Sequence, residues 1–342
     1  MGWTKSWEKP LDGVRLAAAT VLMGAASAAT GQATGQATGP ASCQTRLGDG
    51  GACLFIGHSY FVPVAARFDA IAQASGLGSH GAGFYFAGGT SGSPGSLWDD
   101  ADDSRTEIEA MLAPGNVRVL GMTAFGEFGS TVEDYRLWID LALSYNPDTR
   151  FFIGQPWVPG GPSLDTAAYD DAIETAGDNL FQTVAQLRLD YPNTRIEYIN
   201  YGKTASIMKA EYEAGNLPDV TCLTGCGSAS LFADPSGHAG PMMTDLCAAS
   251  WFDAIYGVGF DELTIPEYQS DTASIVADVL AYNERFPLPP QDWNLDGACS
   301  IFDVSDLLRA FDGSSASADL NGDGVLDSGD VQMAIAALDG AP

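Results

Sequence analysis

The chain has 342 residues, of which 46% are hydrophobic, and its formal net charge is −29 at pH 7. This length allows one large domain with additional segments, and the hydrophobic fraction is ordinary for a globular protein. The negative charge argues against DNA or RNA as a partner, because nucleic-acid phosphates would be repelled. It fits an exported protein or one that collects divalent cations.

The amino end has the pattern of a secretory signal peptide. Three basic residues precede an apolar run at residues 16–26, and Ala26-Ser27-Ala28 is a small-x-small cleavage site. We therefore predict a signal peptide at residues 1–28 and a secreted, extracellular protein. The run is too short to span a bilayer comfortably, so no membrane attachment is expected after cleavage. The repetitive, low-complexity composition of residues 29–49 predicts a flexible leader.

Export makes disulfides plausible for the six cysteines. Six cysteines allow 15 pairings, and the sequence does not choose among them. The near-neighbour pairings are Cys43 with Cys53, and Cys222 with either Cys226 or Cys247.

From residue 50 onwards, strand patterns and helix patterns alternate. The predicted strands are apolar runs at residues 52–56, 84–86, 117–123, 151–154 and 196–200. The predicted helices lie at residues 64–77, 106–112, 133–145, 167–191, 205–214, 244–256 and 273–282. This alternation predicts an α/β domain at residues 50–285, with a parallel sheet covered by helices on both faces.

Small polar turns follow three of the predicted strands, as Gly57-His58-Ser59, Gly88-Gly89-Thr90 and Gly121-Met122-Thr123. In such sheets the loops at the carboxyl ends of the strands hold the functional site. A serine just before a helix lies close to free N–H groups and to the positive end of the helix dipole. That position suits a nucleophile whose reaction intermediate carries an oxyanion.

Only three histidines are available as the base for such a serine: His58, His80 and His238. In an extended segment the side chain of His58 points away from that of Ser59, and His80 has no obvious acid partner. His238 lies four residues after Asp234, whose carboxylate can orient the imidazole. The predicted catalytic residues are therefore Ser59, His238 and Asp234.

These motifs, in this order, resemble the SGNH (GDSL-like) hydrolase family over about residues 50–285. Gly57-His58-Ser59 matches the Gly-Asp-Ser block of the family, with His58 in place of Asp. Asp234 and His238 match its Asp-x-x-His block, with one extra residue between them. The resemblance implies a flavodoxin-like three-layer parallel sheet and a serine ester hydrolase that needs no cofactor for catalysis.

The same resemblance implies an oxyanion hole. Its donors would be the N–H groups of Ser59 and Gly89, with Gly88 as the alternative to Gly89. Thr123 stands where the family has an oxyanion-hole Asn, and a Thr hydroxyl or the amide of Gln155 could replace that donor. Losing one such donor costs roughly 2.7–4 kcal/mol of barrier.

An α/β-hydrolase is the competing fold for a Gly-x-Ser motif. Its nucleophile elbow requires Gly-x-Ser-x-Gly, whereas Phe61 stands at the last position here. Its nucleophile also usually follows several strands, whereas Ser59 follows the first. We therefore favour the SGNH-like architecture.

The composition changes after a proline-rich linker at residues 286–290, because the last 51 residues carry ten Asp and a single Arg. Within residues 291–342 a twelve-residue loop with oxygen ligands at positions 1, 3 and 5, glycine at 6 and an acid at 12 occurs twice. The pattern predicts two Ca²⁺ sites. Their ligands would be Asp292, Asn294, Asp296, Ala298, Ser300 and Asp303 in the first loop, and Asp319, Asn321, Asp323, Val325, Asp327 and Asp330 in the second.

This repeat resembles a type I dockerin, because it is duplicated, lies at the carboxyl end and has Asp rather than Glu at position 12. The resemblance implies a small all-α, calcium-binding domain that docks onto a cohesin-like or other protein. Loop positions 10 and 11, which help to select the partner in dockerins, are Ile301-Phe302 and Ser328-Gly329. They differ between the two loops and leave the partner open.

Together the two resemblances imply a secreted SGNH-type esterase that deacylates carbohydrate esters, since dockerins often accompany polysaccharide-degrading enzymes. Five aromatic residues are candidates for lining a sugar or acyl site: Tyr60, Phe61, Trp98, Trp157 and Trp251. The alternative is a non-catalytic binding or assembly protein that keeps the SGNH scaffold and attaches through the calcium-binding tail. Thr123 at the Asn position and the lengthened Asp–His spacing motivate this alternative.

Overall fold

In the computed structural model, the described residues lie in the part of the chain after Thr38. They are residues 51–76, 80–100, 103–126, 128–191, 194–257, 260, 263–283 and 286 and, near the carboxyl end, 305, 308, 325 and 327–332. The predicted signal peptide, the leader, residues 287–290 of the linker and the whole first calcium loop lie outside these ranges.

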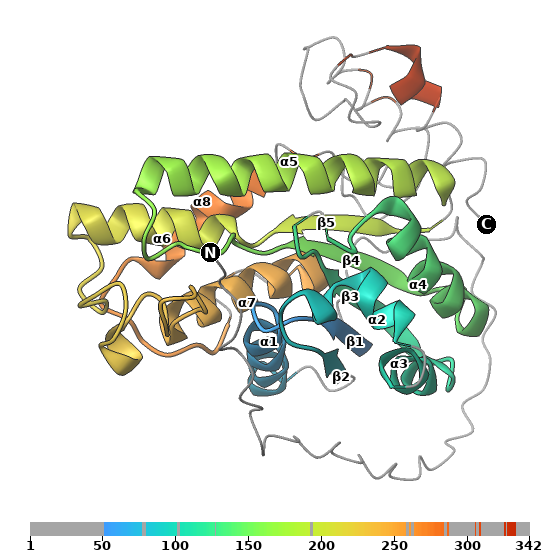
Figure 1. The fold of residues 1–342 in the computed structure, drawn as a ribbon, viewed down its shortest axis with the longest axis horizontal. Coiled ribbons are helices and arrows are strands. Elements are labelled where there is room, and N and C mark those ends of the chain that lie inside the picture. Colours follow the sequence, from blue (N-terminus) through green and yellow to red (C-terminus); the bar gives the residue numbers. More distant parts are fainter. Residues whose placement is uncertain are drawn as a thin grey trace, which may run out of the picture. The chain divides into compact units, whose positions relative to one another are not determined.

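Five parallel strands form one sheet in the order β2-β1-β3-β4-β5 (Figure 1). They are β1 (Ala52–Gly57), β2 (Gly81–Phe86), β3 (Val117–Thr123), β4 (Arg150–Gln155) and β5 (Ile196–Asn200). Strands β1, β3, β4 and β5 are almost entirely buried, whereas β2 at one edge of the sheet is only partly buried. The predicted α/β fold with a parallel sheet is confirmed.

Eight α-helices are described up to residue 283, and residues 328–332 are also helical. The eight are α1 (Val62–Ala74), α2 (Pro94–Asp99), α3 (Ser104–Leu112), α4 (Val132–Tyr145), α5 (Thr166–Asp190), α6 (Lys203–Ala214), α7 (Pro241–Tyr256) and α8 (Thr272–Asn283). Two short 3₁₀ helices lie at Gly89–Gly92 and Gly227–Ala229. The seven predicted helices are confirmed with shifts of a few residues at their ends, and α2 was missed because its six residues are too few to show a helical period.

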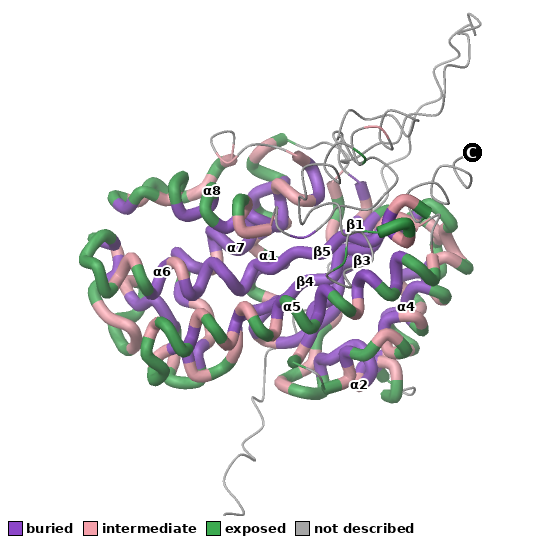
Figure 2. Tube along the Cα trace, turned by 90° about the horizontal axis from the view of Figure 1, so that it is seen from above, coloured by how far each residue is buried: buried purple, intermediate pink, exposed green. Residues whose placement is uncertain are grey.

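The sheet divides the hydrophobic core into two layers, because successive side chains of a strand point to opposite faces. Phe55 of β1 packs in one cluster with residues of α1, α6 and α7. Its neighbours Leu54 and Ile56 pack in the other cluster with residues of α3, α4 and α5. Figure 2 shows β1, β3, β4 and β5 buried along their length, while the helices alternate between buried and exposed turns.

Helix α7 lies unusually close to the sheet because two glycines make room for Trp251. A Cβ atom on Gly154 would lie 2.4 Å from the ring of Trp251, and one on Gly121 would lie 3.2 Å from it. Such distances leave no space for a larger residue on β3 or β4 at these points. This contact holds α7 against β3 and β4, and the loop that carries His238 leads directly into α7.

One of the near-neighbour disulfide pairings is present, between Cys222 and Cys226. Cys53 and Cys247 are free and buried. The pairing of Cys43 with Cys53 is therefore wrong, and so is that of Cys222 with Cys247. The side chain of Cys53 belongs to the hydrophobic cluster between the sheet and α7, where it contacts the core instead of a second sulfur.

Phe286, the first residue of the predicted linker, packs against the domain. Its ring centroid lies 5.0 Å from that of Phe181 on α5 and 4.6 Å from that of Tyr198 on β5.

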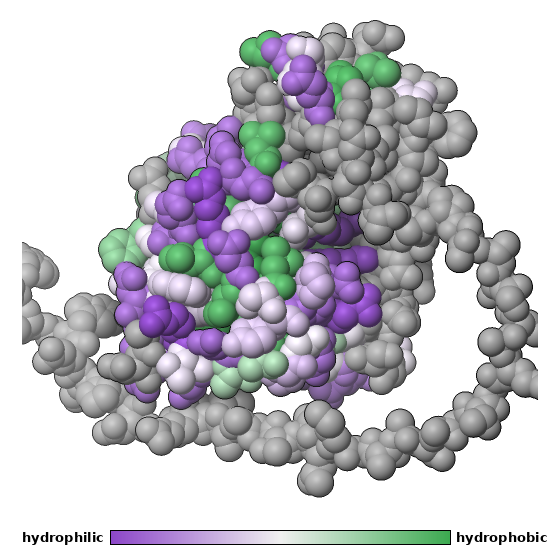
Figure 3. All heavy atoms as spheres, turned by 90° about the vertical axis from the view of Figure 1, so that its right-hand side faces the viewer, coloured by the Kyte–Doolittle hydropathy of each residue, from purple (hydrophilic) through white to green (hydrophobic). Residues whose placement is uncertain are grey.

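None of the helices in the described ranges is both long and apolar enough to cross a membrane. On the side of the molecule seen in Figure 3, hydrophilic side chains surround a smaller hydrophobic area.

Candidate active site

Ser59 lies in the tight turn between β1 and α1, at the carboxyl edge of the sheet. The carbonyl oxygen of His58 accepts hydrogen bonds from the N–H groups of Phe61 and Val62, at 2.9 and 3.1 Å, and so fixes this turn. Strand β1 pairs with β2 on one side and with β3 on the other: the chain runs from β1 to β2, then crosses past β1 to β3 and continues in that direction. Such a switch point is where open α/β sheets place their binding crevices.

The structure brings Ser59, His238 and Asp234 together in one chain of hydrogen bonds. Nε2 of His238 lies 2.9 Å from the Ser59 hydroxyl oxygen, and Nδ1 lies 2.6 Å from Oδ2 of Asp234. Because a carboxylate only accepts, Nδ1 carries the proton and Nε2 is left to accept from the serine. The extra residue between Asp234 and His238 therefore does not prevent their contact.

The carboxylate of Asp234 also shapes the loop that holds the histidine. Its Oδ1 atom accepts from the N–H groups of Ser236, Gly237 and His238, at 2.9, 3.1 and 3.3 Å. Burial alone raises the pKa of Asp234, but the hydrogen bonds from the ring and backbone of His238 outweigh it and leave the pKa below its ordinary value. The group is thus ionised and can stabilise a positive charge on the imidazole.

Two stacked aromatic side chains also hold the loop that carries His238. The Tyr60 hydroxyl donates to the carbonyl of Ser236 at 2.6 Å, and the indole N–H of Trp157 donates to that of Gly237 at 2.7 Å. The two rings stack at 5.1 Å, and the ring of Tyr60 meets that of His238 edge-on at 5.1 Å. Burial raises the pKa of Tyr60 to about 12, so its hydroxyl remains a donor.

His58 connects the Ser59 turn to the loop after β3. Its Nε2 atom lies 2.8 Å from the carbonyl oxygen of Ala124, and Nδ1 accepts from the N–H of Tyr60 at 3.3 Å. Because a carbonyl only accepts, the proton is on Nε2 and the ring is neutral. His58 is 1% exposed, and both of its ring nitrogens are used in these two bonds.

The glycine-rich loop after β2 lies against the Ser59 turn. The N–H of Ala87 donates to the carbonyl of Gly57 at 3.1 Å, and a Cβ atom on Gly92 would lie 2.6 Å from that of His58. Gly89 has a φ of +57° and faces open space. Among the residues that the structure describes, the N–H groups of Ser59 and Gly89 have no acceptor, which leaves both able to bind an oxyanion.

Thr123 does not contribute to such a hole. It is fully buried, its hydroxyl donates to the carbonyl of Gly154 at 3.2 Å, and the hydroxyl of Tyr201 lies 3.0 Å away. The prediction of Thr123 as a third donor is therefore wrong. Gln155 is also buried, and its side-chain N–H donates to the carbonyl of Pro156 at 2.7 Å.

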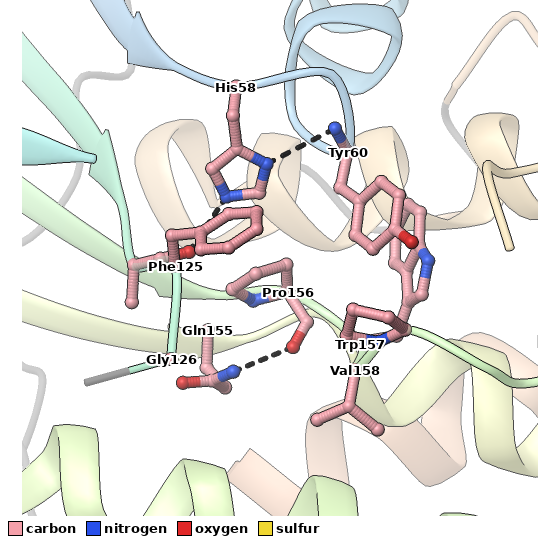
Figure 4. Close-up of a pocket in the computed structure, with 10 residues that line it drawn as sticks. His58, Tyr60, Phe125, Gly126, Gln155, Pro156, Trp157 and Val158 are labelled. Atoms are coloured by element: carbon pink, nitrogen blue, oxygen red, sulfur yellow. Dashed lines mark hydrogen bonds between the residues drawn. The ribbon is translucent and has the colours of Figure 1, made fainter. Parts of the chain in front are cut away.

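A cavity of about 140 Å³ opens beside the Ser59 turn (Figure 4). Its walls come from residues 58 and 60, 124–126 and 155–159, which follow the carboxyl ends of β1, β3 and β4. Of the five aromatic candidates, only Tyr60 and Trp157 line it. Phe61 and Trp251 are buried in the core, and Trp98 packs edge-on against Trp138 of α4.

Three of the twelve predicted calcium ligands lie in the described part of the chain: Val325, Asp327 and Asp330. Val325 is exposed, and the buried carboxylate of Asp330 accepts from the N–H of Asp327 at 3.0 Å. The other nine lie outside the described residues. Within the described ranges there is no group of three or more His, Cys, Asp or Glu residues that could hold a metal ion.

The chain is similar in structure to a DUF4886 family protein from Bacteroides uniformis, with 14% sequence identity, a TM-score of 0.45, and coverage of 68% of this chain and 95% of the other. It is also similar to a candidate GDSL-like lipase from Parabacteroides merdae, with 14% identity, a TM-score of 0.36, and coverage of 63% and 99%. No family model and no curated protein matches the chain. Likeness at this level carries no information about activity, which is inferred below from the site alone.

Proposed function

We propose that this protein is a serine ester hydrolase of the SGNH type. The observation that carries the proposal is the Asp234–His238–Ser59 hydrogen-bond chain, together with two N–H groups that have no acceptor in the described part of the chain. An alcohol, an imidazole and a carboxylate in this order are the groups required for acyl transfer through a covalent intermediate. The cavity next to them provides room for part of a substrate.

In the first half of the reaction, the Ser59 oxygen attacks the ester carbonyl carbon while its proton passes to Nε2 of His238. The negative charge that develops on the carbonyl oxygen is stabilised by the N–H groups of Ser59 and Gly89. Asp234 stabilises the imidazolium ion. His238 then protonates the leaving alcohol, and the acyl group stays on Ser59.

In the second half, His238 takes a proton from water, and the resulting hydroxide equivalent attacks the acyl carbon. The tetrahedral intermediate collapses, the Ser59 oxygen recovers the proton and a carboxylic acid leaves. No step requires a metal ion. The loop of His238 is already held at hydrogen-bond distance, so the base needs little movement in either half.

Covalent labelling with a fluorophosphonate tests the nucleophile directly, because this reagent forms a stable bond with an activated serine. We expect the wild-type chain to be labelled at Ser59 and the Ser59→Ala variant to remain unlabelled. Ser274→Ala, which removes an exposed serine on α8, is the matched control and should label like the wild type. Labelling that persists in Ser59→Ala, or a wild type that does not react, would contradict the proposal.

We further propose that the substrate is an acylated carbohydrate and that the protein is secreted. The signal-peptide pattern at residues 1–28 and the dockerin-like repeat at residues 291–342 support this proposal. The repeat would bind two Ca²⁺ ions and dock onto a cohesin-like protein. These sequence patterns support location and partner, whereas the chemistry depends on the Ser59 site.

Calcium dependence of the carboxyl-terminal segment is tested on the full chain. Adding Ca²⁺ to chelator-treated protein should increase its helical circular dichroism and protect residues 291–342 from proteolysis, because binding orders the loop ligands. Asp323→Ala, at a predicted ligand position, should weaken both effects, whereas Asp312→Asn, outside the loops, should not. Identical spectra and digestion patterns with and without Ca²⁺ would remove the dockerin-like assignment.

A non-catalytic binding protein on the same scaffold is the second candidate. The observation that favours it is the burial of Thr123, which leaves the Ser59 site without a side-chain donor at the position of the family's Asn. A folded wild-type chain that neither reacts with the fluorophosphonate nor hydrolyses any ester would support this candidate. Labelling at Ser59 would exclude it.

A further inference from the structure

We infer that the cavity beside Ser59 binds the acyl part of the substrate, and that it selects short unsubstituted alkyl chains, up to about the size of a hexanoyl group. This inference deepens the proposed function and rests on it. It follows from the position of the cavity, the chemistry of its walls and its volume.

The cavity lies beside the turn that carries the nucleophile. His58 and Tyr60, the residues on either side of Ser59, both line it, and its far walls are Phe125 and Pro156 (Figure 4). Among the described residues neither Ser59 nor His238 lines it, but the ring of Tyr60, one of its walls, lies 5.1 Å from that of His238. Because His238 must protonate the leaving alcohol, we place the alcohol on the His238 side and the acyl chain in the cavity.

The walls of the cavity suit a hydrocarbon chain. Most of the polar side-chain atoms along them are already used: both ring nitrogens of His58, the Tyr60 hydroxyl and the Trp157 N–H have partners within the protein. A side-chain N–H of Gln155 donates to the carbonyl of Pro156. A hydroxylated acyl group entering this space would lose hydrogen bonds to water without equivalent replacements, whereas an alkyl chain would lose none.

The volume limits the length of that chain. A dry protein cavity of about 150 Å³ accommodates benzene, so the cavity of about 140 Å³ has room for a group of similar size. While space remains, each buried methylene should raise kcat/KM about fourfold, the equivalent of about 0.8 kcal/mol. Once the cavity is full, a longer chain must displace packed side chains or leave the cavity, and kcat/KM should fall by about tenfold or more.

The experiment measures kcat/KM of the full chain for p-nitrophenyl acetate, butyrate, hexanoate, octanoate and decanoate. We expect a rise from acetate to butyrate or hexanoate and a fall by decanoate. Phe125→Ala enlarges the cavity and should move the maximum to a longer chain, whereas Val158→Phe fills it and should move the maximum to a shorter one. Phe128→Ala, the same truncation three residues from Phe125 at an exposed position, should keep the wild-type profile.

A binding measurement separates this inference from the proposed function. Saturation-transfer NMR should detect butyramide with the wild-type chain, and decanamide with Phe125→Ala more strongly than with the wild type. An inert wild type that binds butyramide would overturn the esterase proposal and leave the cavity assignment intact. An active wild type with equal kcat/KM from acetate to decanoate, unchanged by Phe125→Ala and Val158→Phe, would overturn the cavity assignment alone. Absence of butyramide binding would also overturn it.

Discussion

Replacing His238 by alanine is expected to lower kcat for ester hydrolysis by about 10⁶-fold, the scale known for serine hydrolases built on the same three groups. Without the imidazole, no group at 2.9 Å from the Ser59 oxygen can take its proton. Ser59→Ala should cause a loss of the same size. Because the two residues act in one step, the double variant should be no slower than either single variant.

Asp234→Asn is expected to cost about 10⁴-fold in kcat. The amide oxygen of Asn can still accept the backbone N–H groups that Oδ1 of Asp234 binds, so the loop should keep its shape. The uncharged amide no longer fixes the histidine tautomer or stabilises the imidazolium ion. Asp99→Asn, at an exposed position on α2, is the matched control and should retain wild-type activity.

These kinetics are measured with p-nitrophenyl butyrate, and the fold of each variant is checked by circular dichroism. A folded His238→Ala variant with wild-type kcat would exclude His238 as the base. An Asp234→Asn variant with wild-type kcat would restrict Asp234 to a role in loop structure. Losses that multiply in the Ser59→Ala, His238→Ala double variant would show that the two residues do not share a step.

The free energy of unfolding is expected to fall by about 3 kcal/mol as the pH drops from 6.5 to 4, because of His58. The pKa of His58 is lowered to about 4, mainly because the ring is buried; the hydrogen bond to Ala124 opposes this change, and the charge of His238 adds to it. In the unfolded chain its pKa is about 6.5. Within this window the unfolded chain binds a proton that the folded chain rejects, so stability is complete above pH 6.5 and is lost as the pH approaches 4.

Urea unfolding at pH 7 and pH 4.5 measures this effect in the wild type and in His58→Gln. Glutamine can still donate an N–H to the carbonyl of Ala124 but does not titrate. The stability lost between the two pH values should be about 2 kcal/mol smaller in the variant. The same substitution at His80 serves as the comparison. Burial also lowers the pKa of this histidine, but its partner is Asp69 instead of a residue of the Ser59 turn. Equal losses in wild type and His58→Gln would contradict the prediction.

The elements that the sequence predicted well are those with a local signal. Strands β3 and β5 begin and end at the predicted residues, because each is an apolar run between polar turns. Ser59, His238 and Asp234 could be predicted as partners because only three histidines exist and one of them follows an aspartate closely, and the structure places the three within hydrogen-bond distance. The contact between Ser59 and His238 depends on the parallel sheet. The alternation of strand and helix patterns in the sequence predicted that sheet.

The features that were missed depend on contacts between distant segments. Nothing near Tyr60 or Trp157 in the sequence indicates that their polar atoms bind the carbonyls of Ser236 and Gly237. Likewise, Thr123 matched a family position in the sequence, but whether its hydroxyl faces the site depends on how β3 packs. In the structure the Thr123 hydroxyl contacts the hydroxyl of Tyr201, 78 residues away. Only information that links Thr123 to Tyr201 across this separation could have corrected the prediction that Thr123 is an oxyanion-hole donor.

The nucleophile and its base come from opposite ends of the domain, 179 residues apart. Ser59 follows the first strand to be synthesised, whereas His238 follows the last strand and depends on the seating of α7 against the sheet. Under the proposed function, a growing or partly folded chain would therefore carry an inert serine, and hydrolysis would begin only when the final helices have docked. Recovery of esterase turnover after denaturation would consequently report completion of the whole domain, without a separate spectroscopic probe.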